Sequence, residues 1–154
     1  MNKSLLLTVE VLVGLSFPSL ALAASISGSA NVNLVNPLTI SEATQLTFGS
    51  ITNLNGSCEM LDDGSLVGTG GQTCSGAQIP AEFTVLGDIG YSVDIVVQAN
   101  NSEPGLSFLP KLVGTETKTL SDGSISFQVV GTLNISNAFE GTYAIPYIVT
   151  VNYQ

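Results

Sequence analysis

The final stretch, Gly141-Thr-Tyr-Ala-Ile-Pro-Tyr-Ile-Val-Thr-Val-Asn-Tyr-Gln154, carries the clearest structural signal in the chain. Apolar side chains occupy every second position. Because alternate side chains of a β-strand point to the same face, they form one apolar stripe along a strand. The stripe consists of Tyr143, Ile145, Tyr147, Val149, Val151 and Tyr153. An apolar strand at the end of a chain offers an unpaired edge to another strand, which indicates assembly rather than catalysis.

The rest of the chain shows the same period-two alternation and almost no helical pattern. Strands are predicted over residues 45–51, 81–86, 91–97, 106–113 and 124–135. Pro110 removes a backbone donor and indicates an edge strand or a bulge. Residues 41–44 could form one helical turn. Short strands at near-regular spacing, with turn residues between them, predict an all-β, single-domain Greek-key β-sandwich.

The N-terminus has the features of a secretory signal peptide over residues 1–23. Lys3 supplies a positive charge, an apolar segment follows, and Ala21-Leu22-Ala23 places small residues before a cleavage site at Ala24. The apolar segment is too short for a membrane anchor and contains Glu10. We therefore expect an exported chain that is not inserted in a membrane after cleavage.

Composition argues against two broad classes of function. Beyond residue 23 the chain has eleven acidic residues, two lysines and no arginine or histidine. Nucleic-acid binding needs basic side chains to neutralise phosphates, so we expect no nucleic acid as a partner. Without histidine there is no imidazole base and no Ser-His or Cys-His pair. We expect no enzymatic activity and no cofactor. Asp62-Asp63-Gly64 lacks the ligand spacing of a calcium loop, which favours a plain solvated turn.

Cys58 and Cys74 lie within residues 53–79, a segment rich in Gly, Ser and Asn that predicts a hairpin or a long loop. In an exported chain an isolated pair of cysteines is most simply a disulfide. It would close a loop of about 15 residues, which stabilises a fold by roughly 3 kcal/mol in the chain-entropy model. A closed zinc site would need further Cys or His ligands, which the chain lacks.

Residues 24–34 form a second alternating segment, and it carries no charge. One face holds Ile26, Gly28, Ala30, Val32 and Leu34, while the other holds serine and asparagine. The missing side chain of Gly28 would suit a narrow place in a receiving groove. The pattern leaves two interpretations open: a strand donated to another molecule, or an ordinary first strand paired within its own domain.

Together, the two ends resemble those of pilins from bacterial chaperone–usher fimbriae. Such pilins have a glycine fourteen residues from the C-terminus, a penultimate tyrosine and an alternating strand between them; here these are Gly141, Tyr153 and residues 141–154. They also have a signal peptide, an alternating N-terminal extension with a small residue midway, and one disulfide. Their cysteines commonly tie the first strand to the end of the second, whereas here both lie within residues 53–79.

This resemblance implies an incomplete immunoglobulin-like sandwich that lacks its last strand. It divides the chain into the signal peptide, a donor strand over residues 24–35 and a pilin-like domain over residues 36–154. The implied partners are other pilin subunits in a head-to-tail filament, a periplasmic chaperone and an outer-membrane usher, and the implied location is the cell surface. Gly141 would allow a tight turn into the last strand. The implied groove and chaperone-binding residues are Gly141, Tyr143, Ile145, Tyr147, Val149, Val151 and Tyr153.

The chain is also similar to a family of secreted bacterial domains catalogued only as of unknown function. That family has a Pro-Leu-Thr-Ile start, a Leu-x-Phe-Gly-x-Ile segment, a Gly-Thr-Leu-x-Ile segment and a Gly-x-Tyr…Val-x-Val-x-Tyr end. The corresponding residues here are 37–40, 46–51, 131–135 and 141–153. This similarity implies a type of domain rather than an activity.

The alternative function is that of a self-contained secreted β-sandwich that binds carbohydrate or another surface partner. Such a domain would pair residues 26–34 within its own sheet. Its exposed tyrosines would be candidates for stacking on sugars, but only four tyrosines exist and three of them lie in the last predicted strand.

Overall fold

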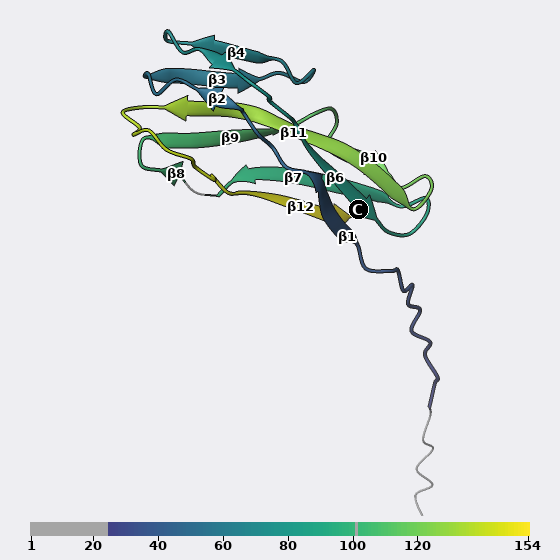
Figure 1. The fold of residues 1–154 in the computed structure, drawn as a ribbon. Coiled ribbons are helices and arrows are strands. Elements are labelled where there is room, and N and C mark those ends of the chain that lie inside the picture. Colours follow the sequence, from purple (N-terminus) through teal and green to yellow (C-terminus); the bar gives the residue numbers. More distant parts are fainter. Residues whose placement is uncertain (1–24, 101) are drawn as a thin grey trace, which may run out of the picture. The chain divides into compact units, whose positions relative to one another are not determined.

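The computed structural model describes residues 25–100 and 102–154, and every regular element in those residues is a β-strand (Figure 1). The all-β prediction is therefore confirmed for the described part of the chain. The predicted signal peptide, residues 1–23, lies outside it. Residues 34–154 form one compact unit, and the described part of the other unit is residues 25–33. No helix in the described residues is long and apolar enough to span a membrane.

The largest sheet has seven antiparallel strands. Its main path runs β1-β6-β11-β3-β4, with β9 on the other edge of β11 and β8 beyond β9. These strands are β1 (Thr39–Thr44), β3 (Gly56–Met60), β4 (Leu66–Thr69), β6 (Ala81–Leu86), β8 (Ser102–Glu103), β9 (Leu106–Leu112) and β11 (Ser124–Ile135). β1 is an edge strand of this sheet.

A second antiparallel sheet has the order β10-β7-β12, which makes β12 an edge strand as well. Its members are β7 (Ser92–Ala99), β10 (Thr117–Thr119) and β12 (Tyr147–Tyr153). The register of β12 against β7 runs from Tyr147 opposite Ala99 to Tyr153 opposite Val93. A small third sheet pairs β2 (Ser50–Ile51) with β5 (Cys74–Ser75).

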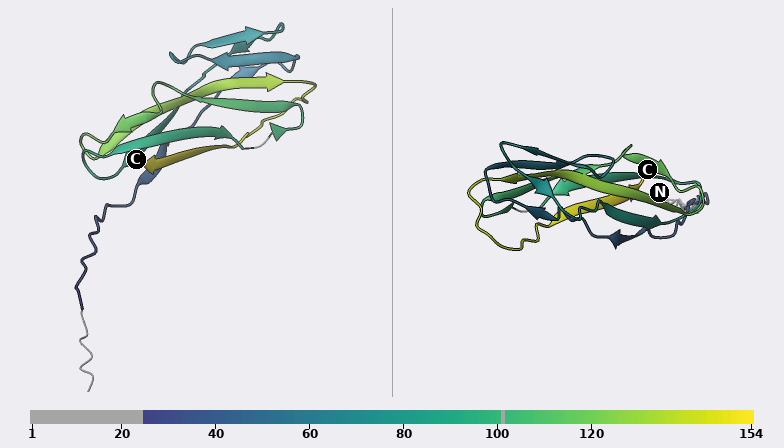
Figure 2. Two further views of the ribbon diagram at one scale, coloured as in Figure 1. Left: turned by 180° about the vertical axis from the view of Figure 1, so that it is seen from behind. Right: turned by 45° about the horizontal axis from the view of Figure 1, so that its top comes forward.

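The two larger sheets face each other across one hydrophobic core, as in a β-sandwich (Figure 2). Apolar residues alternate into this core from both sides, as the period-two pattern predicts. Its buried members are Ala81, Phe83, Val85, Val93, Ile95, Leu120, Phe127 and Val129. The rings of Phe83 and Phe127 stack at a centroid distance of 5.5 Å. Burying each large aliphatic or aromatic side chain contributes about 1.5–3 kcal/mol.

The long strand β11 links the core to the disulfide-bonded part of the domain. Its first half pairs with β6 and its second half with β3, while β9 lies along the other edge of the second half. Alternation breaks at the change of partner, where Val129, Val130 and Gly131 are all buried. Gly131 has φ +153°, and a Cβ there would lie 2.2 Å from the carbonyl oxygen of Leu109. Only glycine fits this close approach without displacing the backbone.

Several sequence predictions need correction. Residues 41–44 are not a helical turn, because they pair with β6 as part of β1. The strand predicted over residues 45–51 is mostly irregular: Thr47 forms an isolated bridge with Ile79, and regular pairing covers only Ser50–Ile51. Tertiary partners decide both cases, since local propensity is weak in such short segments.

The cysteine-containing segment is more regular than a long loop. β3 and β4 form the predicted hairpin and extend the main sheet. The predicted disulfide is confirmed: Cys58 and Cys74 are bonded, with 6.0 Å between their Cα atoms. Pro110 lies in the part of β9 beyond its short pairing with β8. There the described residues supply β11 as the only neighbouring strand, in agreement with the predicted edge position.

Candidate strand-binding groove

β1 and β12 each have one free edge. Among residues 25–100 and 102–154, β1 pairs with β6 alone and β12 with β7 alone. Unpaired strand edges present rows of N–H and C=O groups that can pair with a further strand. The hydroxyl of Tyr153, at the end of β12, donates a hydrogen bond to the carbonyl of Asn36, just before β1. The start of β1 therefore lies near the end of β12, and the two strands run in opposite directions from there.

The backbone amides of Val149 and Val151 point to the free edge of β12. The N–H of Gln154 donates to the carbonyl of Ser92 in β7, at 3.0 Å. In an antiparallel ladder, hydrogen-bonded pairs alternate with non-bonded pairs. The even-numbered residues of β12 therefore bond to β7, and the odd-numbered ones present their N–H and C=O groups away from it.

The same reasoning applies to β1. The N–H of Gly87 donates to the carbonyl of Gly123, at 2.9 Å, so the odd-numbered residues of β6 bond to β11 and the even-numbered ones bond to β1. By the register of β1 on β6, the backbone groups of Ile40 and Glu42 point away from β6. Both free edges thus offer hydrogen-bonding groups to an incoming strand.

A groove of about 1360 Å³ lies between these two edges. One wall comes from residues 40–53 and the other from residues 138–149. The buried residues that line it are Phe83, Leu106, Phe108 and Ile135. The charged residues among the described lining residues are both acidic, Glu42 and Glu140. The groove therefore suits an apolar, uncharged segment of chain.

Hydrogen bonds join the two walls just beyond each end of the groove. At one end the Tyr153 hydroxyl donates to the carbonyl of Asn36, at 3.0 Å. At the other end the N–H of Asn137 donates to the Asn55 side-chain oxygen, at 2.7 Å. Along the groove between these contacts, the described residues show no backbone hydrogen bond from wall to wall. The walls are fixed at their ends and unpaired in between.

Tyr147 stands at the middle of the aromatic lining. Its ring meets Phe83 and Phe108 edge-on, with centroid distances of 6.3 and 5.6 Å. Its hydroxyl is buried and has no hydrogen-bond partner in the described residues. Burial, with a smaller contribution from the Glu42 carboxylate, raises the pKa of Tyr147 to about 12. Leaving a buried hydroxyl without a hydrogen-bond partner costs roughly 1–3 kcal/mol. An inserted strand that offered an acceptor to the Tyr147 hydroxyl would remove this cost.

The N-terminal segment forms no strand between Ser25 and Leu38. The side chains of Ile26, Val32 and Leu34 are exposed to 98, 79 and 85 % respectively. No atom lies within 4 Å of the position that a Cβ would take at Gly28, and Ala30 is exposed. These apolar side chains are therefore exposed in a segment without a strand, and the alternating face of residues 26–34 stays a prediction from the sequence.

The structure divides the predicted wall residues into two groups. Tyr147, Val149, Val151 and Tyr153 share the inner face of β12 and pack against the core. Gly141, Tyr143 and Ile145 line the groove but precede β12, so the prediction that Tyr143 and Ile145 continue the stripe of one strand is wrong. Pro146 has no N–H for a ladder, and β7 ends at Ala99 opposite Tyr147, which leaves residues 141–146 without a partner strand.

The turn geometry before β12 also differs from expectation. The residue with positive φ in this connection is Asn137, at 57°, rather than Gly141. Asn tolerates the left-handed conformation better than most residues. The nearest neighbours of Gly141 are ring atoms of Tyr143, whose hydroxyl donates to the carbonyl of Phe139 at 3.0 Å.

Sequence reasoning missed the opposite wall and the aromatic lining. The signal for Phe48, Phe83 and Phe108 is an aromatic residue on a predicted strand, which does not distinguish a groove from a closed core. Phe48 and Phe108 meet edge-on at 5.8 Å, so they extend the aromatic cluster of Tyr147 across the groove. Only the tertiary structure brings residues 40–53 opposite residues 138–149.

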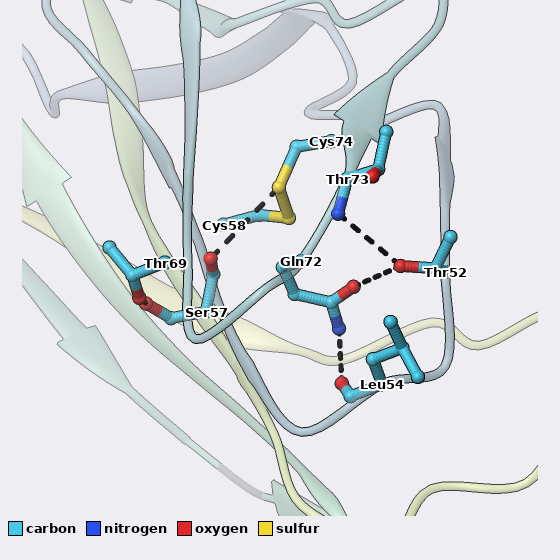
Figure 3. The surroundings of a disulfide bond; sticks show 8 residues. All are labelled: Thr52, Leu54, Ser57, Cys58, Thr69, Gln72, Thr73 and Cys74. Atoms are coloured by element: carbon cyan, nitrogen blue, oxygen red, sulfur yellow. Dashed lines mark hydrogen bonds between the residues drawn. A yellow bond between two sulfur atoms is a disulfide. The ribbon is translucent and has the colours of Figure 1, made fainter.

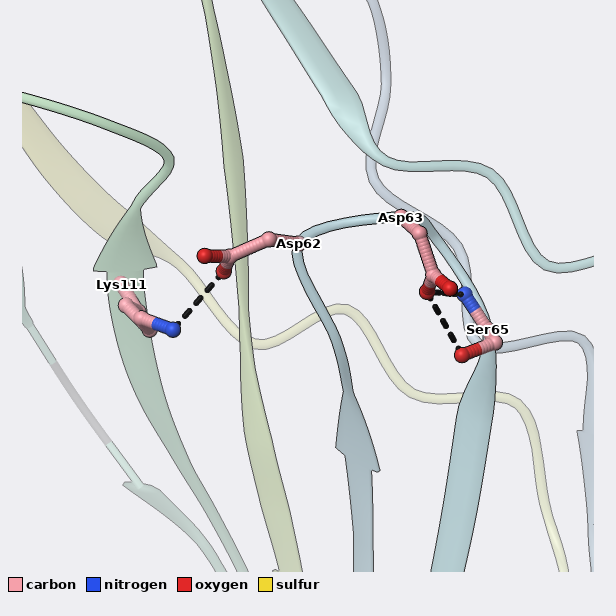
Figure 4. Close-up of polar contacts among 4 residues, drawn as sticks. All are labelled: Asp62, Asp63, Ser65 and Lys111. Carbon is pink, nitrogen blue, oxygen red and sulfur yellow. Dashed lines mark hydrogen bonds and ion pairs between the residues drawn. The ribbon is translucent and has the colours of Figure 1, made fainter.

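The acidic turn at residues 62–64 is engaged in local contacts (Figure 4). The Asp62 carboxylate pairs with Lys111 at 2.7 Å, and this hydrogen bond raises the pKa of the Lys111 ammonium group. The Asp63 carboxylate accepts hydrogen bonds from the hydroxyl and N–H of Ser65, which lower its pKa. The two carboxylates thus serve different partners and do not converge on one point.

Comparison with known proteins adds one family. The sequence model of a family described as a domain of unknown function, DUF4402, matches residues 38–153. Neither a curated protein nor a solved structure matches the chain significantly. The matched region contains both edge strands and both walls of the groove.

Proposed function

This chain belongs to the DUF4402 family, and we propose that it is a structural subunit of a bacterial surface fimbria. Each subunit inserts its residues 24–35 into the groove of the next one. One observation carries the proposal: an apolar groove between two unpaired strand edges occurs in the same chain as an uncharged, alternating segment whose described residues belong to no strand and whose large apolar side chains are exposed.

The acceptor side of the proposal rests on the groove. An inserted strand would bond to the outward backbone groups of Val149 and Val151 on one side and of Ile40 and Glu42 on the other. It would cover Phe83, Phe108 and Tyr147 with apolar side chains. Burial of apolar surface contributes about 25 cal/mol per Å², and paired edges no longer attract other chains.

The donor side rests on residues 25–35. Its inward face would be Ile26, Gly28, Ala30, Val32 and Leu34. Three of these are large apolar residues that the isolated chain leaves largely exposed. Because the segment has no charge, it meets the groove's two carboxylates without repulsion and without an ion to desolvate.

The position of Asn36 makes the contact an open one. Asn36 lies at the Tyr153 end of its own groove. A donor strand antiparallel to β12 would leave the acceptor at the opposite end, near Asn55 and Asn137, so the donor subunit would sit beyond that end. Its own groove stays free for a third subunit. Such head-to-tail contacts do not close on themselves and generate filaments.

The remaining parts of the proposal follow from the pilin resemblance. Residues 1–23 direct export, a periplasmic chaperone fills the groove before assembly, and an outer-membrane usher exchanges the chaperone for the next subunit's strand. The filament stands on the cell surface and supports adhesion. The incomplete immunoglobulin-like topology of the domain belongs to this same proposal.

The self-contained, carbohydrate-binding alternative makes a different demand on the chain. It requires residues 26–34 to pair within their own sheet, whereas the described residues show no strand there. It also requires exposed tyrosines, yet Tyr147 and Tyr153 pack against the core and only Tyr143 of the four tyrosines is exposed. These observations favour the fimbrial proposal.

The test compares residues 24–154 with a variant that lacks residues 24–34, by size-exclusion chromatography and negative-stain electron microscopy. The longer chain is expected to form polymers. The shortened chain should remain monomeric and bind a synthetic peptide of residues 24–35, because the deleted residues belong to no sheet of the described structure. Fibres from the shortened chain, or a longer chain that stays a stable monomer and ignores the peptide, would refute the proposal.

A further inference from the structure

Residues 45–53 of the groove wall, together with Leu54 that follows them, lie outside the two large sheets. Their backbone is held by a neighbouring segment, residues 72–79. Thr47 and Ile79 exchange two N–H···O bonds of 2.9 Å, and Ser50–Ile51 pairs with Cys74–Ser75. The N–H of Thr52 donates to the carbonyl of Thr73 at 3.4 Å. The position of this wall therefore depends on what holds residues 72–79 in place.

The disulfide supplies a covalent tie between that segment and the main sheet. Cys74 lies in β5 and is bonded to Cys58 in β3 (Figure 3). Cys58 is fully buried and lies opposite Leu133 of β11. Gly68 of β4 approaches so closely that a Cβ there would lie 2.3 Å from the Gln72 carbonyl oxygen. β5 is thus attached to the sheet by the sulfur bridge and carries the wall on its other side.

Gln72 adds a polar tie to the same wall. It is buried, with 8 % of its surface exposed. Its side-chain oxygen accepts from the Thr52 hydroxyl, and its side-chain N–H donates to the carbonyl of Leu54 (Figure 3). The Thr52 hydroxyl also accepts from the N–H of Thr73, at 3.3 Å. One buried amide group therefore bonds both to the wall residue Thr52 and to Leu54, which follows the wall.

The main core does not include these ties. Its buried members come from β6, β7 and β11 and from Leu120. Loss of the disulfide or of the Gln72 bonds should therefore loosen the wall while the sandwich keeps its core. A loosened wall must be ordered again when a strand enters, and that cost weakens binding.

We infer that the Cys58–Cys74 disulfide and Gln72 are positioning residues for the acceptor groove. They hold residues 45–54 in place to receive the N-terminal strand of a second copy, so that the oxidised chain binds this strand more tightly than the reduced chain does. This inference rests on the proposed function and adds to it a redox condition and a residue that positions the wall.

The first test measures, by anisotropy, binding of a fluorescent peptide of residues 24–35 to the chain that lacks residues 24–34. Oxidised chain, reduced chain and a Cys58→Ser/Cys74→Ser variant are compared, with urea unfolding as the measure of fold. Affinity should fall by about tenfold or more on loss of the bridge, because the wall is no longer pre-organised. Unchanged affinity in reduced, folded chain overturns the inference. Failure of the oxidised chain to bind overturns the proposed function itself.

The second test keeps the disulfide and changes Gln72, in case the serine variant does not fold. In Gln72→Glu, a carboxylate at about pH 7.5 cannot donate to the Leu54 carbonyl, and affinity should fall by about tenfold. At about pH 5 the buried carboxyl becomes protonated and regains a donor, since burial raises its pKa, so affinity should recover. Gln128→Glu, an exposed position in β11, is the matched control.

A purely structural role for Gln72 predicts a different result. In that case Gln72→Glu would lower the urea midpoint without a pH-dependent recovery of peptide affinity. Equal peptide affinity of Gln72→Glu and Gln128→Glu at both pH values would also overturn the inference. Recovery at low pH in Gln72→Glu alone would support it.

Discussion

The hydroxyl of Tyr153, at the end of β12, donates a hydrogen bond of 3.0 Å to the carbonyl of Asn36, just before β1. The same hydroxyl accepts from the N–H of Asp88, at 2.8 Å, and the Asp88 carboxylate in turn accepts from the N–H of Asn36, at 2.8 Å. The penultimate tyrosine therefore fixes the place from which the N-terminal segment leaves the domain. It also joins the two edges that flank the groove.

Replacing Tyr153 with phenylalanine should destabilise the domain by about 1–2 kcal/mol in urea unfolding, because a partly buried hydroxyl loses two hydrogen bonds while the ring contact with Tyr91 stays. Tyr143→Phe is the matched control. Its hydroxyl makes one exposed bond to Phe139, so its loss should change stability much less. Equal effects of the two substitutions would contradict the role assigned to Tyr153.

Val32→Asp should abolish polymerisation of residues 24–154, because it places a charge on the apolar face of the donor, opposite a groove whose charged residues are acidic. Asn31→Asp adds the same charge one residue earlier, on the outer face, and should still polymerise. Light scattering over time measures both. Loss of polymerisation in both variants would show that net charge matters and the face does not.

The free energy of unfolding should decrease as the pH rises above about 10, because of the ionisation of Tyr147. Its pKa is about 12 in the folded chain and near the ordinary value of 10.0 when unfolded. Below the pKa of the unfolded chain, the phenol is neutral in both the folded and the unfolded state, and its full contribution to stability is present. As pH rises from the unfolded toward the folded pKa, the unfolded chain releases the proton first, so folding weakens.

Tyr147→Phe removes this titration. Urea midpoints between about pH 9 and pH 11.5 should therefore fall less steeply in Tyr147→Phe than in the unchanged chain. Absorbance of phenolate near 295 nm should also show that the last tyrosine to ionise is missing in the variant. Parallel midpoint curves for the two proteins would contradict the burial of this hydroxyl.

Gly131→Ala should destabilise the domain by about 2 kcal/mol or more, because the new Cβ meets the Leu109 carbonyl oxygen in a backbone conformation that favours glycine. Gly28→Ala should leave stability unchanged, since no atom lies within 4 Å of the added methyl group. Thermal unfolding distinguishes them. A stable Gly131→Ala domain would mean that β9 and β11 can separate at this point.

The all-β class and most strands follow from the sequence because side chains that alternate between core and solvent leave a period-two pattern. Residues 81–86, 106–112 and 124–135 are strands in the structure almost as predicted. The disulfide follows from chemistry, since two cysteines in a chain that has no histidine and is predicted to be exported have few other uses. These predictions depend on local pattern and composition alone.

The groove could be predicted only in part. The inner residues of β12 were found because they alternate, but the start of the strand depends on where β7 ends and on Pro146. The opposite wall was not found, because the alternation in residues 45–51 predicts a strand but not its neighbours, and the structure holds these residues through Gln72 and β5. Long-range contacts of this kind leave no periodic signal in the chain.

Amide hydrogen exchange of Val149 and Val151, on the free edge of β12, tests the central claim most directly. The chain lacking residues 24–34 is measured with and without the peptide of residues 24–35, and β7 amides such as Ile95, which bonds to Glu116, serve as internal references. The account predicts that Val149 and Val151 become strongly protected on peptide addition while Ile95 changes little. Exchange at Val149 and Val151 that stays as fast with saturating peptide as without it would contradict the account.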